Sequence, residues 1–390
     1  MSCSKKYGPG AVYVVKESVA NTREAITGAQ GLPCQSITIG ALSQEKIDNN
    51  AVRTDRSQNQ SFTGNQAEIS WELSITVPNE SAVSTGIPEG LQDLFYCAGI
   101  ESDGKLAENS ICMRTLQIVR GDRDGELVEI LNGCIVQQVV WNFSVTEMAT
   151  VTFSGVASKK LELVGGRLVG GQTMNLLQDE ESFTTESQMP LVRASEFLVP
   201  GTFDLNLPDG ISPNVHTAGG ILYGDAVRAG QTFTEIMLSE AVAADTTVSA
   251  VYYKLPAYDI YNTQQVGPSA WKVSMNNSNI PARSFALTLE TGLSYGELTA
   301  GNGFPTERLS GTTKVTGSFN LYLDNEAISA VHAVDDNAIN LTAGTLAINC
   351  PHCAFTETPS YELSADDAAS GEFNFQATCP WAEDHSAVHF

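Results

Sequence analysis

The sequence predicts a mainly β fold, with two tandem β-sandwich or barrel-forming domains that each carry a short flanking helix and a long hairpin loop. Three observations predict it. Charged residues make up only 17% of the 390 residues and hydrophobic residues 42%, which suits many short strands with a surface of Ser, Thr, Asn and Gln. Several segments alternate apolar and polar residues, as half-buried strands do. The same order of segments occurs twice along the chain.

The clearest alternating segments read AEISWELSIT at residues 67–76 and VTGSFNLYL at residues 315–323. In each, every second residue is apolar or glycine and the residues between are mostly polar. An aromatic residue falls in the middle of both, Trp71 in the first and Phe319 in the second. We therefore expect Trp71 and Phe319 to be equivalent core residues of two strands.

A short apolar strand and then a long polar stretch precede each of these segments. The two strands are expected at residues 34–43 and 284–294. Unstructured loops of such length are uncommon inside a compact domain and are often functional. We therefore expect extended hairpins that project from the sheet at about residues 43–63 and 293–311.

A short helix and then a strand–turn–strand unit are expected after each alternating segment. Residues 88–99 have apolar residues at helical spacing, with a proline at the start and a glycine at the end. Residues 325–334 have the same character and predict a second helix. The strand–turn–strand units are expected at residues 134–157 and 353–377.

This repeated order favours an internal duplication over a single large β protein with incidental similarity between its halves. We assign residues 1–165 to a first domain and residues 284–390 to the core of a second. Residues 166–283 contain a linker and several strand-like segments. They form either an inserted β module or an elaborated start of the second domain, and the sequence leaves both open.

Ser294 is the candidate nucleophile, because GLSYG at residues 292–296 matches the G-x-S-x-G pattern of a nucleophile elbow. That elbow needs a strand before the serine and a helix after it. The strand is expected, but the residues that follow contain glycine and proline and do not predict a helix. A serine nucleophile also needs a base, and the candidate histidines that follow Ser294 in the chain are His332, His352, His385 and His389. We therefore expect Ser294 to lie in the first turn of the hairpin.

Cys350 and Cys353 frame the sequence CPHC, which offers two thiols and an imidazole. A structural zinc site needs four ligands, and Cys379 and His385 are not spaced as a second pair. Residues 121–126 read GDRDGE and resemble a fragment of a calcium loop without its distal glutamate, so a tight turn is favoured. We therefore expect no catalytic, cofactor-binding or metal-binding residues, and no enzyme activity.

The chain is strongly acidic, with 45 acidic and 21 basic residues and a formal net charge of −24. Such a charge disfavours a nucleic-acid binder or a protein of anionic membrane surfaces, because both need Lys and Arg. We expect no secretory signal and no membrane anchor, since no apolar run approaches the length of either. The eight cysteines are expected to be mostly buried thiols in a reducing cytoplasm.

The chain resembles the major tail tube protein of long-tailed, siphovirus-type bacteriophages, in a variant whose tube domain is duplicated. The resemblance rests on TTKVTGSFNLYLDNEAISAVH at residues 312–332 followed by GTLAINCPHCAF at residues 344–355. A diverged version reads NQAEISWELSITV and GLQDLFYCAG, followed by GELVEILNGCIVQQVVWNFSV. It covers residues 34–157 and 284–377, about half of the chain.

The resemblance implies a structural virion protein whose domains join edge to edge into a β-barrel around a channel. Rings of this kind stack into the tail tube, with the long hairpins reaching the next ring. The tube is implied to be a negatively charged channel that delivers genome DNA into the host without specific binding. With two domains in each chain, it implies homotrimeric rings of pseudo-sixfold symmetry and no cofactor. The implied partners are other copies of the chain, a tape-measure protein in the lumen, and tail terminator and tail-tip or baseplate proteins at the ends. The protein would be made in the host bacterial cytoplasm. The alternative function is that of a phage or cell-surface β-rich adhesin or carbohydrate-binding protein, and a serine hydrolase that uses Ser294 is a less favoured one.

Overall fold

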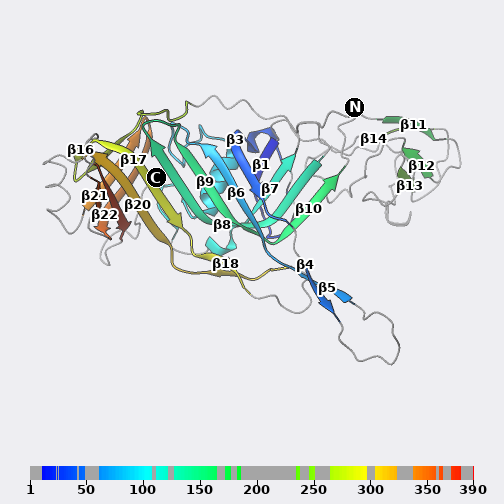
Figure 1. Cartoon of the computed structure of the whole chain (residues 1–390). Helices are drawn as coiled ribbons and strands as arrows, with labels where there is room; N and C mark the ends of the chain where they lie inside the picture. The colour runs from blue at the N-terminus through cyan, green and yellow to red at the C-terminus, as the bar shows by residue number, and fades with distance from the viewer. Residues whose placement is uncertain are drawn as a thin grey trace, which may run out of the picture.

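The computed structural model describes residues 11–22, 24, 26–41, 44–48, 61–107, 111–121, 127–164, 172–176, 182–185, 234–237, 246–250, 264–296, 304–322, 337–356, 360–362, 370–378 and 390. Within these residues the chain is mainly β, as predicted, with one α-helix, α1 (Glu89–Cys97) (Figure 1). The helix expected at residues 325–334 lies outside the described residues. No helix in the described part of the chain has the length and apolar character needed to span a membrane.

Sixteen strands form one open sheet in which all neighbouring strands are antiparallel. Those before residue 165 are β1 (Ala11–Lys16), β2 (Gly31–Leu32), β3 (Cys34–Ile39), β6 (Ile69–Thr76), β7 (Leu116–Gly121), β8 (Leu127–Ser144), β9 (Thr150–Ala157) and β10 (Lys159–Val164). The later ones are β15 (Lys272–Met275), β16 (Ser278–Ile280), β17 (Ala282–Glu290), β20 (Lys314–Tyr322), β21 (Asn337–Ala343), β22 (Leu346–Phe355), β23 (Ser360–Glu362) and β24 (Ser370–Ala377). The sheet of described strands does not close on itself, so these strands form no barrel within one chain.

Four pairs of strands form separate two-stranded sheets. They are β4 (Gln44–Asp48) with β5 (Ser61–Gln66), β18 (Leu293–Tyr295) with β19 (Arg308–Ser310), β11 (Gln172–Leu176) with β14 (Thr246–Ala250), and β12 (Ser182–Thr185) with β13 (Thr234–Met237). The first two pairs are the long hairpins expected from the sequence. In Figure 1, β4 and β5 point away from the main sheet. Two short 3-10 helices, η1 (Gly28–Gln30) and η2 (Ile111–Met113), complete the described elements.

The order of strand pairing is the same in two parts of the sheet. In the first strand set, β2 pairs with β1, β1 with β7, β7 with β8, β8 with β9, β9 with β6 and β6 with β3. In the second strand set, β16 pairs with β15, β15 with β21, β21 with β22, β22 and β23 with β24, β24 with β20 and β20 with β17. The second set begins at β15, inside the segment for which the sequence left an insertion or an early domain start open.

Trp71 and Phe319 are both buried, as expected, but they occupy different places in this pairing. Phe319 of β20 lies opposite Phe373 of β24. The residue that matches Phe373 in the first set is Phe153, and it lies opposite Leu73 of β6. The position of Phe319 is therefore held by Leu73, and Trp71 lies one inward-facing position away.

Each strand set places one aromatic ring over a glycine of the neighbouring strand. Trp71 of β6 lies opposite Gly155 of β9, whereas Phe375 of β24 lies opposite Gly317 of β20. A Cβ atom on Gly155 would lie 3.1 Å from the Trp71 ring, and one on Gly317 would lie 2.2 Å from the Phe375 ring. The aromatic residue and the glycine have exchanged strands between the sets, because the space above the pair holds only one ring.

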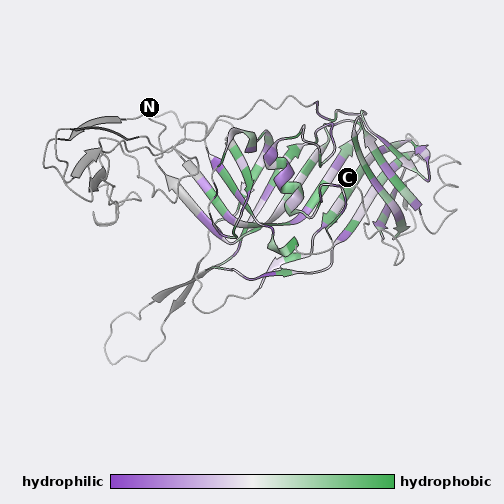
Figure 2. Ribbon diagram, turned by 180° about the vertical axis from the view of Figure 1, so that it is seen from behind, coloured by the Kyte–Doolittle hydropathy of each residue, from purple (hydrophilic) through white to green (hydrophobic). Residues whose placement is uncertain are grey.

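The helix α1 covers one face of the sheet, as the view from behind in Figure 2 shows. Pro88 precedes its first turn, and Gly99, with φ of +92°, follows its end. Phe95 packs on the rings of Trp141 and Phe153, at centroid distances of 6.1 and 5.2 Å. These residues belong to one core cluster that includes side chains of both strand sets.

Candidate functional site

The two strand sets are joined edge to edge within the chain. The first part of β8 pairs with β7 and β10, and its last part pairs with β9 and β17. The pairing of β17 with β8 runs from Ser284 opposite Ser144 to Glu290 opposite Gln138. It produces a row of eight strands in the order β3–β6–β9–β8–β17–β20–β24–β23, here called the strand row.

The seam between β8 and β17 is held by buried aromatic residues and by bonds to the backbone. Phe285 lies opposite Phe143, with ring centroids 6.2 Å apart. Trp271 packs on Phe143 at 5.9 Å and donates its indole N–H to the carbonyl of Ser144 at 3.2 Å. The buried hydroxyl of Thr291 donates to a β8 carbonyl at 2.7 Å. The seam therefore has the character of a protein interior, not of a transient contact.

The strand row ends in two edges. Among the described strands, β3 pairs only with β6 and β23 pairs only with β24. An edge strand presents unpaired backbone N–H and C=O groups, which are a template for pairing with another chain. The two edge strands correspond to the two strands that meet at the seam. In the order of pairing, β3 corresponds to β17, and β23 corresponds to the last part of β8.

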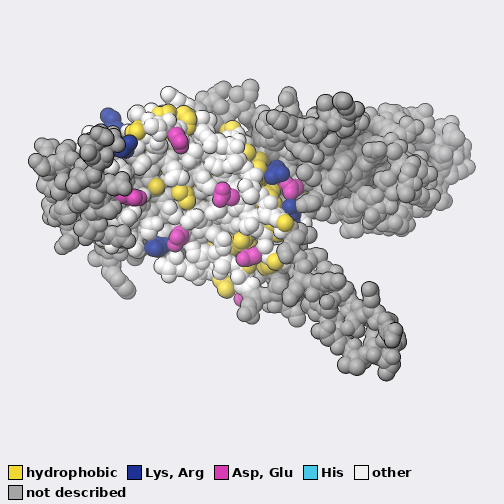
Figure 3. All heavy atoms as spheres, viewed as in Figure 1, with side chains coloured by type: hydrophobic (Ala, Val, Ile, Leu, Met, Phe, Trp, Pro, Cys, Tyr) yellow, Lys and Arg dark blue, Asp and Glu magenta, His cyan; other side chains and the backbone are white. Residues whose placement is uncertain are grey.

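One face of the strand row is core and the other is polar. The polar face carries mostly hydroxyl and amide side chains: Ser36, Thr38, Ser70, Ser74, Thr150, Thr152, Ser154, Asn142, Ser284, Thr288, Thr316, Ser318, Asn320, Asn374 and Gln376. Glu72 and Glu372 also lie on it, and Glu290 lies opposite Lys314. Figure 3 shows this face, on which acidic residues are scattered and not clustered. This face has the Ser, Thr, Asn and Gln character expected of the surface, and Glu72 faces away from the core.

The base of the second hairpin packs on the first strand set. Leu293 of β18 is 3% exposed and packs in a small apolar cluster with Ile135 and Val156. Gln137 donates its side-chain amide to the carbonyl of Leu293 at 3.1 Å. The hairpin is thus fixed on a strand set other than the one from which it extends.

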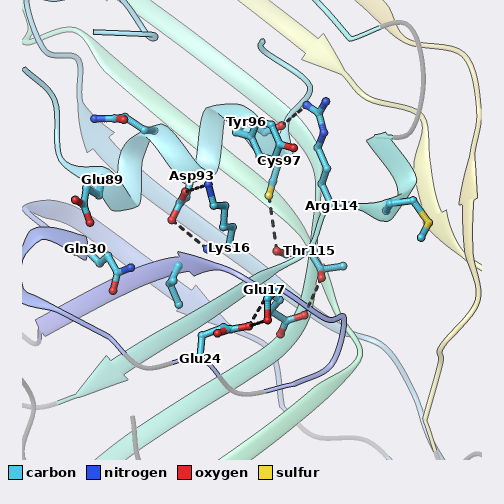
Figure 4. A pocket seen from close by; sticks show the side chains of 14 residues that line it. Lys16, Glu17, Glu24, Gln30, Glu89, Asp93, Tyr96, Cys97, Arg114 and Thr115 are labelled. Atoms are coloured by element: carbon cyan, nitrogen blue, oxygen red, sulfur yellow. Dashed lines mark hydrogen bonds and ion pairs between the residues drawn. The ribbon is translucent and has the colours of Figure 1, made fainter. Parts of the chain in front are cut away.

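A hollow of about 760 Å³ opens beside α1, on the face away from the polar one (Figure 4). Lys16 lies on its rim, with the ammonium 4.0 Å from Asp93, which also accepts the Lys16 backbone N–H at 3.0 Å. The guanidinium group of Arg114 lies over the ring of Tyr96, 4.0 Å from the ring centre, and pairs with Glu101. These four charged groups are therefore engaged in two pairs.

Glu17 also lines this hollow and accepts four hydrogen bonds. Its carboxylate accepts from the Thr115 hydroxyl at 2.7 Å, the Asn132 amide at 3.1 Å, and the backbone N–H groups of Asn21 and Gly133 at 2.8 Å each. Burial raises the pKa of Glu17, although these donors act in the opposite direction. The group ties the loop after β1 to β8 and to Thr115, just before β7, which is a structural role.

Ser294, the candidate nucleophile, lies within β18 and is paired with Leu309 of β19, so the expectation that it lies in the first turn of the hairpin was wrong. It therefore does not sit at a turn from a strand into a helix, as an elbow serine would. His352 lies on β22, where its carbonyl accepts the N–H of Thr378. The other histidines considered with Ser294, at positions 332, 385 and 389, lie outside the described residues.

Cys350 and Cys353 are each 1% exposed. The pairing of β21 with β22 is irregular between them, and this irregularity turns both side chains inward although they are three positions apart. The described part of the chain holds no group of three or more His, Cys, Asp or Glu residues placed to bind a metal. Residues 122–126 and Cys379 lie outside that part.

Comparison with known proteins gives one family. A family model described as phage tail tube protein matches residues 10–377. No curated protein matches the chain. The matched range begins one residue before β1 and ends at the last residue of β24, so it contains both strand sets.

Proposed function

The chain belongs to the phage tail tube protein family, a family of structural components of the virion tail, and from this premise we propose that three copies close into a ring with pseudo-sixfold symmetry. The observation that carries the proposal is the seam between β8 and β17. One chain already joins two similar strand sets edge to edge. Its two outer edge strands, β3 and β23, correspond to the two strands that meet at the seam. Repeating one head-to-tail contact with a rotation that closes produces a ring.

The seam supplies the register of the proposed contact between copies. Within the chain, Leu287 of β17 lies opposite Trp141 of β8. Ile39 of β3 corresponds to Leu287 of β17, because they pair with corresponding positions of β6 and β20. Tyr361 of β23 corresponds to Trp141 of β8, because they pair with corresponding positions of β24 and β9. The ring would then place Ile39 of one copy opposite Tyr361 of the next, and pairing would remove both exposed edges.

The polar face of the strand row would line the channel. The opposite face is buried against α1 and the other strands, so it is not available as a wall. Hydroxyl and amide side chains with few cations offer little to hold DNA phosphates, because Lys and Arg supply most of the affinity for them. The resemblance implied a negatively charged channel; the described residues support a mostly neutral wall with scattered carboxylates.

The remaining parts of the proposal concern the assembled tail. Rings stack into a tube of long-tailed phage type, with the hairpins reaching between rings. The lumen holds a tape-measure protein and later passes genome DNA, and tail terminator and tail-tip or baseplate proteins close the ends. The chain is made in the host bacterial cytoplasm. Nothing in the described residues favours the alternative of an adhesin or carbohydrate-binding protein.

A pair of cysteines at the proposed contact tests it. Thr38 and Glu362 should lie opposite each other between copies, because Ala286 lies opposite Asn142 at the seam. Directly opposed residues have Cβ atoms about 5 Å apart, within reach of a short thiol cross-linker. The T38C/E362C variant should give covalent dimers and trimers, whereas the A286C/N142C control should cross-link within one chain. Single-cysteine variants report the background from the native thiols. Assembled rings that yield no cross-linked multimers would contradict the register.

A further inference from the structure

The base of the second hairpin shows how a hairpin docks on a neighbouring strand set. Leu293 covers Ile135 of β8 and Val156 of β9, which lie opposite each other. Both belong to the polar face, where apolar side chains are otherwise uncommon, and both are buried. Their apolar character is explained by the hairpin together with Ile111 of η2, which belongs to the same cluster.

Polar contacts fix the same docking on both sides of the hairpin. The hydroxyl of Tyr295 donates to the carbonyl of Gly133 on β8. The hydroxyl of Ser158, just after β9, donates to the carbonyl of Pro305 in the segment before β19. The hairpin base is therefore held by two bonds to carbonyl groups as well as by its apolar contact.

The second strand set has the same position on its own strands. Ala354 of β22 lies opposite Gln376 of β24, as Ile135 lies opposite Val156. A similar backbone contact follows in each set: the N–H of Ser158 donates to the Asn132 carbonyl of β8 at 3.1 Å, and the N–H of Thr378 donates to the His352 carbonyl of β22 at 2.8 Å. Both Ala354 and Gln376 are part-exposed, in contrast to their buried counterparts.

The first hairpin is the matching element. The hairpin β4–β5 follows β3 as β18–β19 follows β17. Its base is the pair Gln44 and Gln66, and β3 is an outer edge of the strand row. In the described chain, β3 has no second strand set on its outer side.

We propose that the base of β4–β5 docks on Ala354 and Gln376 of a second copy of this chain. This inference rests on the proposed ring, which brings β3 of one copy beside β23 of the next. It adds a second contact to the paired edges, in the geometry that β18–β19 already shows within the chain.

The residue types fit an interface that forms only on assembly. The docking within the chain buries apolar side chains, whereas the position on β22 and β24 is part-exposed in a single chain. Contiguous apolar surface on a free subunit promotes unspecific association, so a small residue and an amide suit this position. Gln44 and Gln66 at the base of the hairpin are polar in the same way.

The test is the Ala354→Arg variant, in which a long charged side chain occupies the proposed docking position. Ala347 is exposed on the same strand and supplies the matched control, Ala347→Arg. We expect A354R to keep the wild-type melting temperature but to need at least about tenfold more protein to form rings in sedimentation and negative-stain microscopy. We expect A347R to assemble as the wild type does.

A second measurement covers the case in which A354R fails to fold. A Gln44→Cys/Gln376→Cys variant should form cross-links between chains in assembled rings. If rings form but A354R assembles normally, or if this pair gives no cross-link, the docking is overturned and the ring is not. If the wild type forms no rings, the proposed function itself fails, and the T38C/E362C pair reports that separately.

Discussion

Replacing Phe285 by alanine tests whether the two strand sets share one core across the seam. Phe285 is 1% exposed, and its ring lies 6.2 Å from the rings of both Phe143 and Phe375. Removing a buried phenylalanine side chain costs 3–5 kcal/mol in typical cores, so we expect a loss of about 4 kcal/mol. With a urea dependence of about 3 kcal/mol per molar, the unfolding midpoint would fall by about 1.3 M.

The assay is urea unfolding followed by circular dichroism, together with hydrogen exchange of the β6, β9, β20 and β24 amides. Because the core is continuous, F285A should lower one common transition, and amides of both strand sets should exchange faster. The control is Ala286→Ser, on the polar face beside Phe285, which should change stability by less than about 0.5 kcal/mol. Exchange that rises only in β20 and β24, or a loss below about 1 kcal/mol, would refute a shared core.

Three further substitutions test local features. The Glu17→Gln variant should lose about 2 kcal/mol of the free energy of unfolding, measured in urea. The glutamine NH2 group would face the N–H donors that the carboxylate accepts in the wild type. Since burial raises the pKa of Glu17 above 4.5, the wild type should lose stability as the pH rises through the range just above that value, and the variant should lack this component. Gly155→Ala would place a Cβ 1.9 Å from a β8 carbonyl and should cost at least about 2 kcal/mol in thermal unfolding, whereas Gly267→Ala, with nothing within 4 Å, should be neutral. Ser294→Ala should leave ring formation unchanged, and an esterase activity of the wild type that this change abolished would contradict a purely structural role.

The strands were the part of the fold most accessible to sequence reasoning. Alternation located β6 and β20, and the proline and glycine that bound α1 located the helix. Alternation did not fix the register, because a shift of two residues preserves the pattern of inward and outward side chains. That is why Trp71 was matched with Phe319 although the pairing relates Phe319 to Leu73.

Other features depend on contacts between distant segments. The first part of β8 pairs with β7 and its last part with β17. The continuous hydrophobic sequence of β8 does not indicate where the pairing with one strand ends and the pairing with the other begins. The apolar pair Ile135 and Val156 on the polar face has a reason only once the hairpin that covers it is known. Net charge, likewise, says how many acids the chain has but not which face carries them.

The central claim is that one chain supplies two units of a closed ring. Cryo-electron microscopy of the purified, assembled protein tests it most directly. The proposal expects rings or tubes with a central hole, three copies in each ring, and β3 of one copy paired with β23 of the next in the register of the β8–β17 seam. Monomers that persist at high concentration, or rings of six copies, would contradict it.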